Sequence, residues 1–175
     1  MIATTYETAG GIRVHRTVEE IPVANAIEPV VQALDAHPGV LLASSYEYPG
    51  RYKRWDMGFV DPPLALTARN RDFRVQALNP RGRVLLAPIL DILRSLDAVE
   101  RVSAAEDSLE GVIRAPPGRF VEEERSRQPS VFSLLRALGA LFRHQDEPHL
   151  GLYGAFGYDL AFQFEPIRLR LERPA

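Results

Sequence analysis

The sequence predicts an α+β fold in which antiparallel strands alternate with isolated helices. Residues 64–69 and 73–78 each alternate apolar and polar side chains, and the short polar link between them completes the pattern of a β-hairpin. Residues 27–34 and 130–143 instead place apolar side chains at the i, i+3, i+4 and i+7 spacing of an amphipathic helix. With 175 residues, the chain is long enough for one domain with a sizeable core, or for part of a larger one.

The N-terminal part of the chain is expected to lead into a buried strand. Residues 1–11 look irregular up to two consecutive glycines, and the alternation in residues 12–18 predicts a half-buried strand. The helix at 27–34 should end at the His-Pro-Gly sequence of residues 37–39. The continuous apolar run of residues 40–43 then predicts a central strand that is covered on both faces.

The middle of the chain carries weaker signals. Residues 79–82 predict a turn, and a short strand from Val84 should lead into a helix at about 87–96. Residues 108–114 predict a further strand. The polar residues 115–129, which include prolines and a glycine, predict a long surface connection.

The last third combines a strong helix with an aromatic, glycine-spaced segment. Ser130 suits the N-cap of the helix at 130–143. The core-facing stripe of this helix consists of Val131, Leu134, Leu135, Leu138 and Phe142. Residues 150–165 predict a strand, whose glycines at 151, 154 and 157 indicate close approach of another backbone or of bulky groups.

Composition narrows the class of partner. The formal net charge of −2 argues against nucleic acid, because binding to phosphates needs a basic surface. The chain has no cysteine, which excludes disulfides and thiolate chemistry. We see no secretory signal, and no apolar run approaches the roughly 18 residues that a membrane span needs, so the cytoplasm is the default location.

The stretch from residue 40 to residue 63 has the composition of a small-molecule pocket. Its apolar strand ends in two serines, and three tyrosines and the single tryptophan of the chain follow, interleaved with basic side chains. The basic residues are Arg51, Lys53 and Arg54. Apolar walls with a few hydroxyls and cations can hold a ligand that carries a carboxylate.

A purely structural explanation of the same residues stays open. Ser44 also suits the end of a strand, where a serine hydroxyl bonds to nearby backbone. Lys53 and Arg54 could pair with Asp56 or Asp61 at the surface, where an ion pair contributes under about 1 kcal/mol.

The sequence shows no catalytic or metal-binding motif of its own. Its four histidines are scattered and lack the spacing of metal ligands, so we interpret them as solvated side chains. The carboxylates of residues 122–124 lie in a polar loop and predict a solvated face. The chain has neither a dinucleotide-binding fingerprint nor a nucleophile elbow. We therefore assign no catalytic residue, no metal ligand and no cofactor to it.

Three long motifs resemble the N-terminal region of anthranilate synthase component I. They are residues 40–52, 54–63 and 151–166. The resemblance runs from about residue 10 to the C-terminus, and it fits best the bacterial form in which the synthase and its glutamine amidotransferase are fused. Residues 55–63 and the Tyr158-Asp159 pair favour the anthranilate branch over the related aminodeoxychorismate and isochorismate synthases.

The resemblance implies a role within a larger lyase. Such an enzyme converts chorismate and glutamine-derived ammonia to anthranilate in tryptophan biosynthesis, uses Mg²⁺, and is subject to feedback inhibition by tryptophan. Its fold is a two-sheet sandwich, and its chorismate and Mg²⁺ sites lie in a C-terminal domain that residues 1–175 lack. The chain would then be an N-terminal regulatory portion, inactive by itself.

The implied partners are tryptophan as effector and the glutamine amidotransferase component, fused or separate. A portion of a sandwich should also leave open sheet edges and exposed apolar surface, which favour self-association.

The resemblance also implies where tryptophan binds. The family's effector site is lined by a Leu-Leu-acidic-Ser strand and by a basic residue some ten positions later. Matched residue by residue, the strand falls on Leu41, Leu42, Ala43 and Ser44. The basic residue falls on Arg54 or Lys53, and Pro22 corresponds to a proline before the first helix. The expected effector-binding residues are therefore Leu42, Ser44, Arg54, Lys53 and Pro22.

One position departs from the family pattern. Ala43 stands where many members carry an acidic side chain, which would help to neutralise the ammonium group of tryptophan. We therefore expect weaker or altered inhibition. Three alternatives stay open: a stand-alone amino-acid-binding module, the N-terminal part of an aminodeoxychorismate synthase, and a scaffold that contacts the amidotransferase component.

Overall fold

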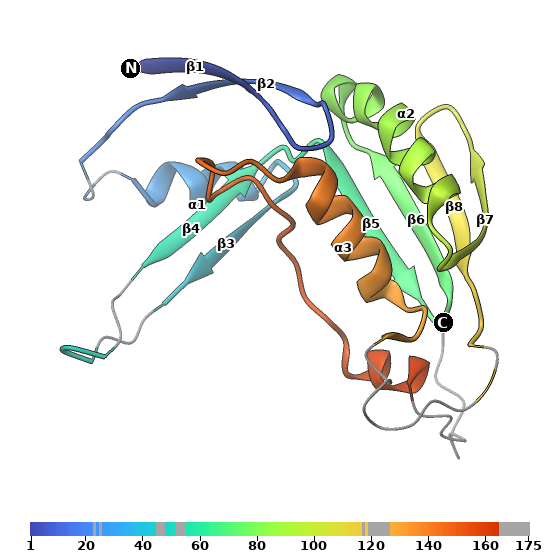
Figure 1. The fold of residues 1–175 in the computed structure, drawn as a ribbon. Coiled ribbons are helices and arrows are strands. Elements are labelled where there is room, and N and C mark those ends of the chain that lie inside the picture. Colours follow the sequence, from blue (N-terminus) through green and yellow to red (C-terminus); the bar gives the residue numbers. More distant parts are fainter. Residues whose placement is uncertain are drawn as a thin grey trace.

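The computed structural model of the chain confirms the α+β class. It describes residues 1–22, 24, 26–44, 48–51, 55–116, 118 and 127–164. Within these ranges, three α-helices accompany three antiparallel sheets of two, two and four strands. Figure 1 shows the four-stranded sheet and two helices as one body, from which the two smaller sheets extend as hairpins.

The four-stranded sheet has the strand order β5-β6-β8-β7. Its strands are β5 (Leu64–Arg69), β6 (Asp72–Ala77), β7 (Val99–Ala104) and β8 (Ser108–Ile113). The β5–β6 hairpin confirms the prediction from alternation, and Asn70 in its turn adopts a positive φ of 53°. The predicted strand at 108–114 is confirmed as β8, whereas β7 was not predicted.

Two helices cover one face of this sheet. Helix α2 (Pro80–Ser95) and helix α3 (Val131–Phe142) pack against each other, and their apolar stripes meet alternate residues of β6 and β8. The most deeply buried side chains are Ile89, Leu93, Leu109, Ile113, Leu134 and Val75. We call the β5–β8 sheet with α2 and α3 the body of the molecule.

Helix α2 begins earlier than the sequence indicated. The turn expected at residues 79–82 is the first turn of the helix, because the Asn79 side chain accepts a hydrogen bond from the Gly82 N–H at 3.2 Å. Pro80 fits the first helical position, where its missing N–H costs nothing. The strand expected at Val84 was therefore wrong, and the helix runs to Ser95.

Helix α3 confirms the prediction of a helix at 130–143. Val131, Leu134 and Leu138 are buried as expected. Leu141 is the fourth buried residue, while Leu135 and Phe142 are only half-buried. The Val131 N–H, which has no partner within the helix, donates to the side-chain oxygen of Gln163 at 3.0 Å.

The N-terminal residues form a hairpin that docks on α3. Strand β1 (Ile2–Glu7) pairs with the predicted strand β2 (Arg13–Val18), so the expectation of an irregular N-terminus was wrong. In the turn, the Thr8 hydroxyl and the Gly10 N–H both donate to the Leu141 carbonyl, at 2.7 and 3.0 Å. This contact satisfies a carbonyl at the C-terminal end of α3.

A second hairpin carries the stretch that the sequence singled out. Strand β3 (Gly39–Ala43) pairs with β4 (Asp56–Val60), and α1 (Glu28–Leu34) lies against one face of the pair. We call β3–β4 the site hairpin. The strand predicted at residues 40–43 is confirmed as β3, but the expectation that it is covered on both faces was wrong, because no residue of β3 or β4 is fully buried.

The segment after α3 is irregular up to a 3-10 helix, η3 (Tyr158–Gln163). The strand expected at residues 150–165 was therefore wrong. Its glycines do not mark close contacts either, since a Cβ atom on Gly151, Gly154 or Gly157 would meet no atom within 4 Å. Most of the expected surface connection at 115–129 lies outside the described residues. Within the part of the chain that the structure describes, no helix is long and apolar enough to cross a membrane.

Candidate functional site

The site hairpin presents two faces of different character. Side chains alternate along a strand, so Gly39 and Leu41 share one face and Val40 and Leu42 share the other. Helix α1 covers the first face: a Cβ atom on Gly39 would collide with the Leu34 side chain. The strand pair therefore approaches α1 closely on that face and leaves the opposite face available.

The face opposite α1 combines apolar side chains with a serine. Leu42 stands opposite Met57 in the pairing register, and Val40 stands opposite Phe59. Ser44 follows on the same face, and its N–H donates to the Trp55 carbonyl at 2.8 Å, which extends the ladder beyond β3. We call this face, made by Val40, Leu42, Ser44, Met57 and Phe59, the candidate site.

The candidate site is open at its outer end and closed at its inner end. Leu42 is 38% exposed and Trp55 is 53% exposed, so apolar surface near Ser44 faces solvent. At the inner end, the ring of Phe59 contacts the ring of Tyr153, with centroids 5.7 Å apart and planes tilted by 51°. A ligand of amino-acid size can therefore reach the outer end from solvent.

The structure places only some of the effector-binding residues predicted from the sequence on the candidate site. Leu42 and Ser44 lie on the same face, as an effector site would require. Pro22 is exposed in the connection from β2 to α1, the helix that covers the other face. Lys53 and Arg54 lie outside the described residues. The alternative ion pair from these residues to Asp56 or Asp61 is therefore untested.

Three side chains of this region were not singled out from the sequence. Met57 and Phe59 are two positions apart, so the sequence alone indicates that they share a face of their strand. Only the pairing register shows that they stand opposite Leu42 and Val40. Tyr153 lies about a hundred positions away along the chain and was expected in a strand. No local pattern reveals its contact with Phe59.

Ala43 has an acidic neighbour across the strand pair. Its register partner is Asp56, and cross-strand partners point to the same side of a sheet. Side chains in this relation have Cβ atoms about 4.5–5.5 Å apart. The carboxylate of Asp56 therefore stands beside the position where the family pattern places an acidic residue, on the face toward α1 and not on the candidate site.

The site hairpin joins the body through a fixed connection at Asp61. This residue has a positive φ of 51°, and its N–H donates to the Pro38 carbonyl at 2.8 Å. Its own carbonyl accepts from Arg81 at 2.8 Å and from the Asn79 side chain at 3.3 Å. Asn79 and Arg81, at the start of α2, therefore hold the end of β4.

A wide groove of about 2390 Å³ runs between the site hairpin, β5, α2, α3 and the segment after α3. Its central lining is mostly apolar and includes Val40, Phe59, Leu66, Leu135, Tyr153 and Phe162. The inner end of the candidate site borders this groove, because Val40 and Phe59 belong to both.

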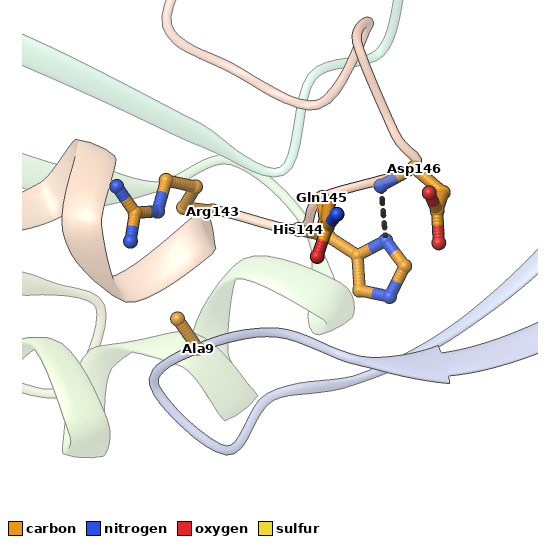
Figure 2. A pocket seen from close by; sticks show the side chains of 5 residues that line it. All are labelled: Ala9, Arg143, His144, Gln145 and Asp146. Atoms are coloured by element: carbon orange, nitrogen blue, oxygen red, sulfur yellow. Dashed lines mark hydrogen bonds between the residues drawn. The ribbon is translucent and has the colours of Figure 1, made fainter.

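A second, smaller hollow of about 660 Å³ lies where the N-terminal hairpin meets the end of α3. Figure 2 shows its lining side chains, with the Asp146 N–H donating to Nδ1 of His144 at 3.2 Å. On its other side, the His144 ring contacts the ring of Tyr6, with centroids 4.4 Å apart. These contacts join two segments of the chain, and they give no arrangement of nucleophile and base.

The described residues also offer no evident place for Mg²⁺. No group of three histidine, aspartate or glutamate side chains within the described ranges lies close enough to hold a metal ion. A Mg²⁺ ion is bound chiefly through carboxylates and substrate phosphates.

Comparison with known proteins gives two relatives. Over 169 residues, or 97% of its length, the chain is 52% identical to the anthranilate synthase of Azospirillum brasilense. Over 130 residues, or 73% of its length, it is 30% identical to the pyocyanine-specific anthranilate synthase component 1 of Pseudomonas aeruginosa. No family model and no solved structure matches.

The chain spans only 23% of the length of each relative. The match to the first relative nevertheless includes nearly all of this chain, and about half of the aligned residues are identical. The chain is therefore homologous to the N-terminal region of anthranilate synthase component I, the family that its motifs resemble.

Proposed function

We propose that the chain serves as the N-terminal, tryptophan-sensing part of an anthranilate synthase. The observation that carries this proposal is the 52% identity over 97% of the chain to a protein of that name. The whole enzyme would form anthranilate from chorismate and glutamine-derived ammonia, in tryptophan biosynthesis, together with a glutamine amidotransferase component. The bond-making groups and Mg²⁺ would belong to the rest of that enzyme, so this chain alone would be inactive.

In this proposal, the candidate site is the effector site. An indole ring would pack on Leu42 and Met57, because both are apolar and Leu42 is partly exposed. The ligand carboxylate would meet Arg54 or Lys53 through a charge-assisted hydrogen bond. Arginine and lysine in the loop of the site hairpin provide that charge in the sequence.

The ligand ammonium needs an acceptor, and backbone carbonyls at the end of β3 provide one. Asp56 stands beside Ala43 in the register, but both belong to the face toward α1 and not to the face of Leu42 and Ser44. The absence of an acidic side chain at position 43 therefore leaves the face of Leu42 and Ser44 unchanged in this proposal.

Thermal unfolding with and without tryptophan tests the proposed site. A ligand that binds only the folded state, at about 100 times its Kd, stabilises by about 2.7 kcal/mol. We expect Ser44→Ala and Arg54→Ala each to reduce the tryptophan-induced rise in Tm. The matched control is Ser103→Ala, since Ser103 is an exposed strand serine in the body whose hydroxyl donates to the Glu110 carbonyl at 3.4 Å.

The control variant should respond to tryptophan like the unchanged chain. Equal responses of Ser44→Ala and Ser103→Ala would show that the ligand binds elsewhere. The absence of any shift with tryptophan would contradict effector binding by this chain.

A further inference from the structure

The segment after α3 is held at both of its ends, by the N-terminal hairpin at its start and by the body at its end. We call residues 147–163 the strap. At its start, the buried Glu147 forms an ion pair with Arg16 of β2, and its other oxygen accepts from the His149 N–H at 3.1 Å. Figure 1 shows the strap passing from the inner end of the site hairpin along α3 to the far end of that helix.

At its end, the strap is held through Gln163. The side-chain oxygen of Gln163 accepts from the Val131 N–H at 3.0 Å, and its amide nitrogen donates to the Asn70 carbonyl. The Gln163 carbonyl in turn accepts from Arg71 at 3.3 Å. These bonds connect the strap to the β5–β6 turn and to the first turn of α3.

The middle of the strap is packed much less tightly. Leu152 is 47% exposed, and the three glycines of this stretch have no neighbouring atom within 4 Å of a Cβ position. The contact with the site hairpin is made by the ring of Tyr153 on Phe59. The Tyr153 hydroxyl donates to the His149 carbonyl at 2.7 Å, which fixes the ring relative to the start of the strap.

Phe59 belongs to the face on which the effector is proposed to bind. It is the next residue of β4 on the same side as Met57, about 7 Å along the strand. The covalent connection of the hairpin to the body is held at Asp61 by Arg81 and Asn79. Beyond that joint, the Phe59–Tyr153 contact connects the hairpin to the strap.

We propose that Tyr153 is a positioning residue that couples occupancy of the candidate site to the body. A ligand held against Leu42 and Met57 would reorient Phe59, and Tyr153 would carry that change into the strap and so to Asn70 and Val131. The inference rests on the proposed effector site. A ligand can shift an arrangement only through different contacts in its two states, and the Phe59–Tyr153 pair is the contact that would differ in this proposal.

Hydrogen exchange of the full chain, followed by mass spectrometry with and without tryptophan, tests this coupling. Tryptophan should slow exchange in residues 39–44 and 55–60, and also in residues 148–164. In Tyr153→Ala, the protection of the hairpin should remain, and the response of residues 148–164 should disappear. The Kd for tryptophan should change by less than about tenfold, which is the most that one aromatic pair accounts for.

Two further variants separate coupling from simple loss of structure. Tyr153→Phe keeps the ring and should keep the response of the strap. Tyr158→Ala removes another strap tyrosine, which is 89% exposed, and should also leave the response intact. Urea unfolding of each variant verifies that the body is folded.

The outcomes distinguish the two proposals. Protection of the hairpin without any change in residues 148–164 of the unchanged chain would overturn the coupling and leave the effector site standing. An unchanged strap response in Tyr153→Ala would also overturn it. No protection in either region would overturn the effector site, and the coupling with it.

Discussion

The body and the site hairpin are stabilised in different ways. In the body, β6 alternates fully buried and exposed side chains, and Ile89, Ile113 and Leu134 are completely shielded from solvent. The site hairpin has no fully buried residue in either strand, and neither has α1. Burial of apolar area therefore stabilises the body, whereas the hairpin depends on backbone pairing and on one covering helix.

This difference suits the two regions to different roles. Local opening costs least where few apolar side chains are buried, and ligand-binding elements commonly come from such regions. The site hairpin carries the residues that the family resemblance connects with effector binding, and it stands on a fixed joint at Asp61. A well-packed body with a less buried hairpin is compatible with the proposed sensing role.

The largest expected difference comes from truncating one leucine in each region. Leu134→Ala should lower the free energy of unfolding by about 2–5 kcal/mol, because it leaves a cavity at a fully buried position. Leu42→Ala, the same change at a residue that is 38% exposed, should cost about 1 kcal/mol or less. Urea unfolding followed by circular dichroism measures both. Equal losses would mean that the hairpin is as tightly packed as the body.

A pair of glycines tests the connection between the two regions. A Cβ atom on Gly82 would collide with the carbonyl of Pro63, in the link from the site hairpin to β5. Gly82→Ala should therefore lower the free energy of unfolding by about 1–3 kcal/mol. Gly139 in α3 has open space around it, so Gly139→Ala should raise stability by about 0.5–1 kcal/mol.

Both glycine variants can be compared by thermal and urea unfolding. A Gly82→Ala chain as stable as the unchanged protein would show that the start of α2 can move away from the link. In that case the joint at Asp61 would be less rigid than its hydrogen bonds indicate.

Periodic elements of the body could be predicted from sequence, and elements with broken periodicity could not. The β5–β6 hairpin and α3 follow their periods closely. Strand β7 was missed because a register shift between Val99 and Arg101 interrupts the alternation, which leaves its two valines three positions apart. The start of α2 was missed because Asn79-Pro80 suits a turn as well as a helix cap.

The candidate site could likewise be predicted only in part, because some of its residues follow a local pattern and others do not. Successive side chains of a strand point to opposite faces, so a strand at residues 40–43 places Leu42 and Ser44 on one face. The residues of the partner strand, Met57 and Phe59, are added only once the register is known. The contact of Tyr153 depends on the path of an irregular segment. Its aromatic residues indicated a strand, because aromatic side chains are enriched in strands, and its glycines were interpreted as points of close approach within that strand.

The smallest effect is expected at a contact in the body that involves no burial. Arg83 of α2 forms two hydrogen bonds with Asp107 of the β7–β8 turn, at 2.5 and 3.2 Å, and both side chains are largely exposed. Exposed ion pairs contribute little to stability, so Asp107→Asn should shift the urea midpoint far less than Leu134→Ala. Glu106→Gln, which neutralises the neighbouring carboxylate, is the matched control.

The dependence on pH gives a second measure of the same contact. The hydrogen bond to Asp107, and then the charge of Asp107, raise the pKa of Arg83 above its usual value. A cation whose pKa is raised in the folded state contributes stability that is fully present below its unfolded-state pKa. This stability is lost only as the pH rises through the folded-state pKa. The pH range from about 6 to 9 lies far below the pKa of arginine. The contribution of Arg83 to the free energy of unfolding should therefore stay constant across this range. A pH dependence in that range that Asp107→Asn abolishes would mean that exposed charges, as well as burial, determine the stability of the body.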